Sequence, residues 1–274
     1  MNQATKDLLQ QEYRRAVLSA NSGIRAFQTF YENIQQSEIF DEDSDTIDAF
    51  IDGIRGTLRQ REKYKEMDKM INSIKITFHY ISIWQNSTIN VEFTSRMKSV
   101  GSTLAKLLSK SLATNESISI RDTYGIRGIS KNEEDDEEES IQHIYNLYNA
   151  FLGIVAQRSR KKKAIFQEWL STREISKEEK EAISYVMNCP FAISYVKDYI
   201  QNPKSNGYQS LQFTLSIPMY SEILPGAQIE VQLRTESMHW VATEGPAAHE
   251  DYKDDSLQEV KDIFTIQWIL CSCI

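Results

Sequence analysis

The chain has few cysteines, and this scarcity excludes two kinds of small cross-linked domain. Only three cysteines occur in 274 residues: Cys189 stands alone, and Cys271 and Cys273 lie close together. Neither a disulfide framework nor a four-ligand zinc pattern can be built from this set. A reducing compartment fits best, so the sequence predicts a cytoplasmic protein.

Long apolar runs and familiar nucleotide-binding loops are also missing. No stretch approaches the roughly 18 apolar residues of a membrane-spanning helix, and residues 1–15 lack the apolar core of a signal peptide, so no membrane association is expected. Walker, GxGxxG and GxSxG patterns do not occur. A net charge of −8 argues against a protein that wraps nucleic acid. A local basic patch is still compatible with this net charge.

Apolar residues make up 41% of the chain, which is enough for a folded core, and their spacing changes along the sequence. Helical spacing with little glycine or proline predicts a helical N-terminal region over residues 1–86. A mixed α/β domain is expected over 87–254, and a helix or tail over 255–274. Strands are predicted at 89–98, 118–129, 211–217 and 228–234, and helices after Ser102, near Ile141, after Thr235 and after Ser256.

Two charged runs interrupt the mixed region. Seven consecutive acidic residues, Glu133 to Glu139, repel one another and are expected to form a solvated loop before the helix near Ile141. A basic run follows, and two short helical segments come after it. This run could hold an RNA backbone through phosphate contacts, or it could be a solvated loop. Its members are Arg158, Arg160, Lys161, Lys162 and Lys163.

The most informative strand reads IEVQLRT. Side chains alternate along a strand, so Glu230, Gln232 and Arg234 share one face, and the apolar residues between them share the other. The apolar face belongs to a core. The polar face is either an ordinary half-exposed sheet surface or part of a site.

A second segment, RDTYGIR, offers a partner for this polar face. Asp122 and Arg127 flank Gly125, where backbone or ligand can approach closely. Mg²⁺ often takes one or two protein carboxylates together with substrate phosphates, so Asp122 and Glu230 would suffice for a nucleotide site. The alternative is a salt bridge at the end of a strand.

Two further segments could bind a nucleotide. RMKSVGSTLAK places Arg96, Lys98 and Lys106 around an expected helix start. Free amides and the helix dipole at such a start would favour a triphosphate. The alternative is that these residues are solvated surface charges. In NPKSNGYQSL a turn lies between Lys204 and Tyr208. Tyr208 could stack on a base or could pack within the protein.

A zinc-protease reading of HWVATEGPAAH is rejected. His239, Glu244 and His249 are spaced by five residues, so each is rotated by about 140° from the one before it and they cannot share a helix face.

Taken in order, RxKS, RDxxGIR, VKDYIxNPKxNGYQSL and IEVQLRTxxMHWVATEGPAAHxxYK resemble the synthetase domain of the RelA/SpoT family, from about Val91 to Lys253. Several long motifs in the family's order make the resemblance specific. It implies a RelA/SpoT nucleotidyltransferase-like α/β fold, a mixed five-stranded sheet flanked by helices. It also implies a pyrophosphokinase that moves the β,γ-pyrophosphate of ATP to a ribose 3′-hydroxyl with Mg²⁺ as cofactor.

The resemblance further implies a role for each matching residue. Asp122 and Glu230 would be catalytic and hold the metal, with Glu230 acting on the attacking hydroxyl. ATP would be bound by Arg96, Lys98, Ser102, Lys106 and Arg127. The acceptor would be bound by Tyr208, Lys204, Lys197, Gln232 and Arg234.

Departures from the family pattern leave the acceptor open. Gln212 stands where YQSLH usually carries histidine. Pro246 interrupts the helix after the last strand and would kink this helix or shift its start. Four histidines without a His-Asp dipeptide indicate that the hydrolase domain of long family members is missing.

Three readings of the function follow. The first is a small alarmone synthetase making (p)ppGpp from GDP or GTP. The second is a toxic small alarmone synthetase that modifies the tRNA 3′-CCA end and is restrained by a protein antitoxin. The third is a catalytically silent nucleotide-binding module. A homo-oligomer is compatible with each.

Overall fold

The computed structural model describes residues 7–9, 11–13, 15, 29–30, 32–34, 52–54, 64–98, 103, 106–107, 123–132, 136–156, 159–219, 221–222 and 224–247. The chain divides into two compact units. The sheet unit contains residues 64–97 and 124–252, and the second unit contains 1–63, 98–123 and 253–274.

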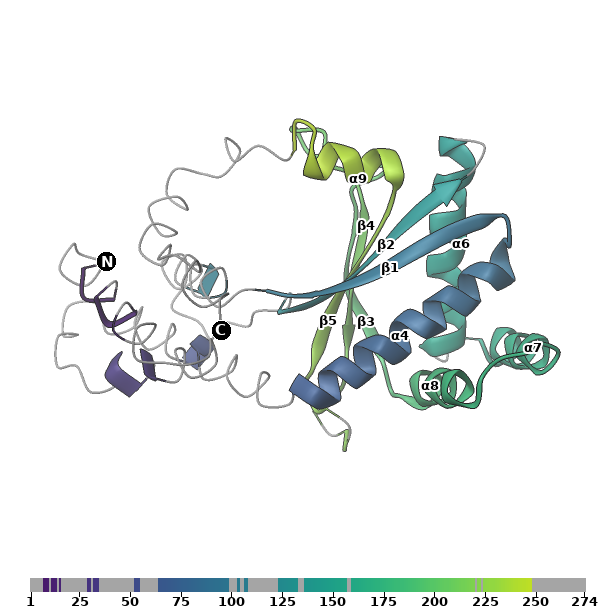
Figure 1. The fold of residues 1–274 in the computed structure, drawn as a ribbon, viewed down its shortest axis with the longest axis horizontal. Helices are drawn as coiled ribbons and strands as arrows, with labels where there is room; N and C mark the ends of the chain where they lie inside the picture. The colour runs from purple at the N-terminus through teal and green to yellow at the C-terminus, as the bar shows by residue number, and fades with distance from the viewer. Residues whose placement is uncertain are drawn as a thin grey trace. The chain divides into compact units, whose positions relative to one another are not determined.

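The sheet unit is built on a mixed sheet of five strands in the order β1-β2-β5-β4-β3. Its strands are β1 (Ile89–Met97), β2 (Tyr124–Asn132), β3 (Ala192–Asp198), β4 (Leu211–Ser216) and β5 (Gln228–Thr235). β2 runs parallel to β5, and the other neighbours are antiparallel. This arrangement, seen at the centre of Figure 1, confirms the predicted fold class.

Among the residues that the structure describes, five helices accompany the sheet (Figure 1). They are α4 (Tyr64–Gln85), α6 (Glu137–Val155), α7 (Arg160–Ser171), α8 (Lys177–Asn188) and α9 (Glu236–Thr243). α4 packs on β1, α6 packs on β2 and β5, and α7 and α8 pack on α4 and α6. In the described part of the chain, no helix combines the length and the apolar character needed to cross a membrane.

One face of the sheet forms the core with α4 and α6. Phe78 from α4 is fully buried and stacks on Phe151 of α6 with ring centroids 3.9 Å apart, and on Phe93 of β1 at 5.3 Å. The apolar members of β5, Ile229, Val231 and Leu233, are buried on this face. Because side chains alternate along a strand, the polar members of β5 are directed to the opposite face, here called the polar face.

The acidic run is partly helical, which corrects the predicted loop. α6 begins inside the run at Glu137, with Asp136 as its N-cap accepting a hydrogen bond from the Glu139 amide at 3.0 Å. Carboxylates at a helix start are stabilised by the free amides and by the helix dipole, and this outweighs their mutual repulsion. Glu137 also accepts hydrogen bonds from Thr235 (2.6 Å) and Ser237 (2.7 Å), which fixes the start of α6 against the start of α9.

The basic run is likewise helical where it is described. Ser159 caps α7, and residues 160–163 form its first turn, while Arg158 lies outside the described residues. Lys163 donates to the Met187 carbonyl at 2.8 Å near the end of α8. The stem of Lys162 covers Gly153, where an added Cβ would lie 2.7 Å from Lys162 Cδ. These two lysines therefore contribute to helix packing, although Lys162 is itself exposed, as are Arg160 and Lys161.

The structure differs from two further predictions, one at the sheet edge and one at the end of α9. β3 was not among the predicted strands, because its alternation is broken in the middle. α9 follows Thr235 as predicted, but it ends at Thr243 instead of being kinked at Pro246. The residue before a proline disfavours the helical conformation, so ending the helix early avoids the conflict.

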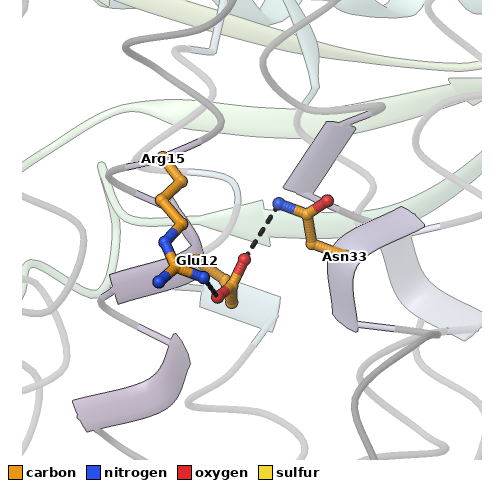
Figure 2. A network of polar contacts seen from close by, with 3 residues as sticks. All are labelled: Glu12, Arg15 and Asn33. Carbon is orange, nitrogen blue, oxygen red and sulfur yellow. Dashed lines mark hydrogen bonds and ion pairs between the residues drawn. The ribbon is translucent and has the colours of Figure 1, made fainter.

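In the second unit, the described residues of 7–15, 29–34 and 52–54 are helical, as predicted for this region. Figure 2 shows how the first two of these segments are joined: the nearly buried Glu12 accepts from Arg15 at 2.6 Å and from Asn33 at 2.9 Å. Tyr13 and Phe30 pack edge to face beside this network, with centroids 5.5 Å apart.

A buried histidine makes the stability of the sheet unit depend on pH. His143 of α6 lies 2.8 Å from the Ser82 hydroxyl of α4, and burial lowers its pKa, with Glu139 opposing. Because the folded pKa is below the unfolded value of about 6.5, the contribution is present above about pH 6.5 and is lost as the pH falls through the folded pKa. The midpoint of urea unfolding should thus drop between pH 7.5 and 5.5 more steeply in the unsubstituted protein than in His143→Gln. Parallel slopes in the two proteins would contradict this.

Candidate functional site

The polar face of the sheet holds a cavity of about 200 Å³ across three strands. Its walls come from β1, β2 and β5, and they include Arg96, Arg127, Glu230 and Gln232. Small-molecule pockets commonly measure about 300–1,000 Å³, so this cavity matches part of a nucleotide and not the whole of one. Four residues predicted from three separate motifs therefore meet at one place.

Strand register explains why they meet. Gly125 of β2 is paired with Arg96 on one side and with Glu230 on the other. In the next row of the sheet, Arg127 is paired with Gln232. Paired residues project from the same face, so all four side chains share the polar face. An added Cβ at Gly125 would lie 3.5 Å from Arg96 Cγ, which shows that the Arg96 side chain lies over this glycine.

The polar side chains of β5 form a hydrogen-bonded chain. Gln232 donates from Nε2 to Glu230 Oε2 at 2.7 Å, and Arg234 donates from Nη2 to Gln232 Oε1 at 2.9 Å. Gln232 and Arg234 are almost fully buried, with 9% and 2% of their surface exposed. Residues two apart on a strand lie on one face, so β5 alone holds the Glu230 carboxylate in a fixed orientation.

The site is rich in positive charge that the described residues do not neutralise. Burial lowers the pKa of Arg127, and Arg96 lowers it further. Burial also lowers the pKa of Arg234, where Tyr208 and Glu230 oppose the effect of Arg127 and Arg96. Among the described residues no hydrogen-bond acceptor meets the buried Nε of Arg127 or of Arg234. Unpaired buried guanidinium donors are suited to an anionic ligand.

Tyr208 lies beside these cations. Its ring is 5.0 Å from Lys204 Nζ and 5.5 Å from Arg234 Cζ, and Lys204 is also 4.9 Å from the Tyr199 ring. These are cation–π distances. The loop between β3 and β4 thus carries Tyr208 and Lys204 to the polar face of β5.

Gln212 holds the tyrosine in place, a role that the sequence did not reveal. It donates from Nε2 to the Tyr208 hydroxyl at 2.8 Å and to the Ser210 hydroxyl at 2.9 Å. Gln212 is paired with Gln232 of β5 and with Lys197 of β3, so it continues the polar row across the sheet. Lys197 therefore occupies the same face as the cavity.

His239 of α9 is a second residue that sequence reasoning missed as part of this site. α9 packs on β2 and β5, the strands that carry Arg127 and Arg234. Burial lowers the pKa of His239, and Arg234 and Arg127 lower it further. Its Nδ1 is buried and has no hydrogen-bond partner among the described residues. The available signal was its place at the start of the helix that Thr235 caps, shortly after Arg234 in the sequence.

Four residues predicted to bind ATP or magnesium are not among those that line this cavity. Asp122 and Ser102 lie outside the described residues. Lys98 and Lys106 are described, but they belong to the second unit.

Glu230 supplies one carboxylate of the kind that a magnesium ion binds. Within the described ranges, no group of three or more His, Cys, Asp or Glu side chains could hold a metal. Glu230 is the carboxylate that lines the cavity. One or two carboxylates with substrate phosphates are a usual Mg²⁺ environment, so Glu230 fits as one ligand of such an ion.

Tyr145 of α6 supports the loop that carries Tyr208. Its hydroxyl donates to both carboxylate oxygens of Asp198, at 2.9 and 3.1 Å, and burial with this contact raises the pKa of Tyr145 to about 12. Asp198 in turn accepts from the amides of Ile200 and Gln201 at 3.0 Å. Tyr145→Phe should cost about 1.5–3 kcal/mol, as expected for a hydrogen bond to a charged group. The midpoint of urea unfolding would measure this loss.

Comparisons with known proteins agree with the motifs. The model of a region found in RelA/SpoT proteins matches residues 95–257. A guanosine-3′,5′-bis(diphosphate) 3′-pyrophosphohydrolase of Borreliella burgdorferi is 26% identical over 247 residues, which cover 90% of this chain and 28% of that protein. A GTP pyrophosphokinase of Myxococcus xanthus is 41% identical over 73 residues, which cover 27% of this chain and 9% of that protein.

Solved structures include a small alarmone synthetase 2 from Bacillus subtilis, which is 22% identical. The match covers 77% of this chain and 94% of that one, with a TM-score of 0.40. The chain spans less than a third of the length of the two curated relatives above.

Proposed function

Because the chain belongs to the RelA/SpoT family, we propose that it transfers the β,γ-pyrophosphate of ATP to the ribose 3′-hydroxyl of GDP or GTP, giving (p)ppGpp. The observation that carries the proposal is the cavity at which Arg96, Arg127 and Glu230 meet. Cations and one carboxylate around a small cavity suit a reaction that needs alignment, charge neutralisation and one proton transfer.

In the proposed step, the acceptor 3′-oxygen forms a bond to the β-phosphorus of ATP. The bond from this phosphorus to the oxygen bridging the α-phosphate breaks, and AMP leaves with that oxygen. Glu230 takes the proton of the attacking hydroxyl. Its bond from Gln232, which Arg234 holds in turn, supports this role because the carboxylate is already oriented.

ATP would be bound by the residues that the family resemblance assigns to it. Arg96 and Arg127 would flank the adenine, and Lys98, Ser102 and Lys106 would reach the phosphates. Asp122 and Glu230 would hold a magnesium ion, which when bound would neutralise phosphate charge.

The acceptor would lie toward β4 and β3. Tyr208 would stack on its base, and the hydrogen bonds from Gln212 and Ser210 to the Tyr208 hydroxyl support this, because they fix the ring before the ligand arrives. Lys204 and Lys197 would contact the acceptor phosphates. His239 offers a buried ring nitrogen to the same region.

A tRNA 3′ end is the alternative acceptor, and a protein antitoxin would then be the partner. The observation in its favour is the exposed first turn of α7 at Arg160 and Lys161, which could contact an RNA backbone. α7 packs on α6 and α4, however, and these helices cover the apolar face of the sheet, whereas the cavity lies on the polar face. The guanine nucleotide is therefore the preferred acceptor.

The test is transfer of label from ATP carrying ³²P at its γ-phosphate. The protein is incubated with Mg²⁺ and ATP, and GDP, GTP and deacylated tRNA are offered separately, with Asp122→Ala as the inactive control. Label on GDP or GTP is the expected result.

Each other outcome replaces the proposal with a defined alternative. Label on tRNA alone would establish the toxin reading. ATP binding without transfer to any acceptor would leave a silent nucleotide-binding module. Absence of ATP binding would overturn the enzymatic reading altogether.

A further inference from the structure

The edge strand β3 contains a β-bulge directly before Lys197. Ser194 is paired with Thr214 of β4, and the next pair is Lys197 with Gln212. Two residues, Tyr195 and Val196, therefore stand opposite a single residue of β4. Tyr195 has φ = 52°, in the left-handed region that tyrosine rarely adopts.

The bulge reverses which side chains face the cavity. Before it, Ile193 is paired with the buried Leu215 on the apolar face. An uninterrupted alternation from this pair would place Val196 opposite Gln212 and would turn Lys197 toward the apolar face. One extra residue restores Lys197 to the polar face, next to Gln212.

Asp198 gives an independent check of this geometry. It is paired with the buried Leu211, and it is contacted by Tyr145 of α6, the helix that packs on the apolar face. Since neighbouring residues of a strand project to opposite faces, Lys197 must project to the polar face.

Exposure of the bulge residues argues that this conformation is not maintained for core packing. Tyr195 and Val196 have 51% and 49% of their surface exposed. Strained backbone of this kind persists where the surrounding structure over-determines it, and it is common beside functional sites.

We infer that the Tyr195 bulge is the positioning device that presents Lys197 to the phosphates of the acceptor nucleotide, an inference that rests on the function proposed above. Tyr195 is a positioning residue, because it acts through Lys197 and not on the ligand. The bulge serves the acceptor only: the cavity residues assigned to ATP lie on β1 and β2, which do not pair with β3.

A matched pair of substitutions separates backbone conformation from loss of the ring. Asparagine and valine are similar in size and both remove the tyrosine ring, but asparagine tolerates the left-handed region and a β-branched side chain does not. Initial rates are measured against GDP at saturating ATP, and against ATP at saturating GDP. Tyr195→Val should raise the KM for GDP about tenfold, and Tyr195→Asn should leave it within about twofold of the original. The KM for ATP should stay unchanged in both.

The same pair is then placed in a Lys197→Ala protein. If the bulge acts through Lys197, the difference between the valine and asparagine proteins disappears in this background. Loss of folded protein would instead lower kcat and leave the KM for GDP unchanged.

Two results would overturn the inference: equal KM values for GDP in the valine and asparagine proteins, or a valine effect that persists without Lys197. Failure of the proposed function would be seen separately, because the unsubstituted protein would then transfer no label from ATP to GDP.

Discussion

Glu230→Gln is expected to lower pyrophosphate transfer by about 10²–10⁴-fold, the range lost when a general base is removed. Glutamine is nearly isosteric, and its side-chain oxygen can still accept the 2.7 Å hydrogen bond from Gln232. The variant should therefore fold normally and should lose only the capacity to take a proton. The KM for ATP should change little, because Arg96 and Arg127 are untouched.

Single-turnover transfer from γ-labelled ATP to GDP would measure this effect. Glu222→Gln is the matched control, because Glu222 is exposed on the connection between β4 and β5 and lies away from the cavity residues. A Glu230→Gln protein that keeps more than about a tenth of the original rate would exclude Glu230 as the base, since that role contributes at least about 10²-fold. Asp122 would then be the next carboxylate to test.

The polar row of β5 could be predicted from sequence because a strand has a period of two. Glu230, Gln232 and Arg234 were placed on one face from the letters IEVQLRT alone, and the structure confirms that face. The meeting of β5 with Arg96 and Arg127 came from the family resemblance, since strand order is a long-range property. Periodicity alone gives no register between separate strands.

β3 could not be predicted because its bulge destroys the period on which strand prediction depends. Ile193 and Asp198 lie on the same face although they are five residues apart, which a regular strand forbids. The prediction of a loop for the acidic run was wrong for another reason. Repulsion among Glu133 to Glu139 was weighed, but the capping of α6 by Asp136 was not. That cap, with the bonds from Thr235 and Ser237 to Glu137, depends on tertiary structure.

Gln212 illustrates how a departure from a motif can be recognised before its meaning is known. The sequence marked it as unusual, and only the structure shows that its amide is bonded to Tyr208 and Ser210. If Tyr208 binds the acceptor as proposed, this amide would affect the acceptor through the position of the Tyr208 ring.

Arg234→Met is expected to reduce transfer by about 10²-fold or more while stabilising the fold. Arg234 is 2% exposed, and its guanidinium makes one hydrogen bond to Gln232 while its Nε has no partner among the described residues. Burying a charge without full compensation is costly, and replacing buried ionic groups by apolar ones of similar volume is often neutral or stabilising by about 1–4 kcal/mol. Methionine has a similar length and can fill irregular space.

The loss of activity has a separate cause. Arg234 orients Gln232, which orients Glu230, and its charge lies beside Tyr208, on which the acceptor base is proposed to stack. Removing one preorganised donor from such a site typically costs about 10²–10³-fold in kcat. Thermal unfolding should therefore shift upward by about 2–4 °C for each kcal/mol gained, with transfer nearly abolished.

Arg173→Met is the control for removing an arginine charge, because Arg173 is exposed and its contact is a cation–π interaction with Trp169 at 4.9 Å. It should leave both transfer and unfolding nearly unchanged. Opposite changes in stability and activity at Arg234 would mean that its buried charge is maintained for the ligand at a cost to the fold. A fall in both stability and activity would mean that Glu230 already compensates the Arg234 charge in the folded chain. Glu230 does oppose the lowering of the Arg234 pKa.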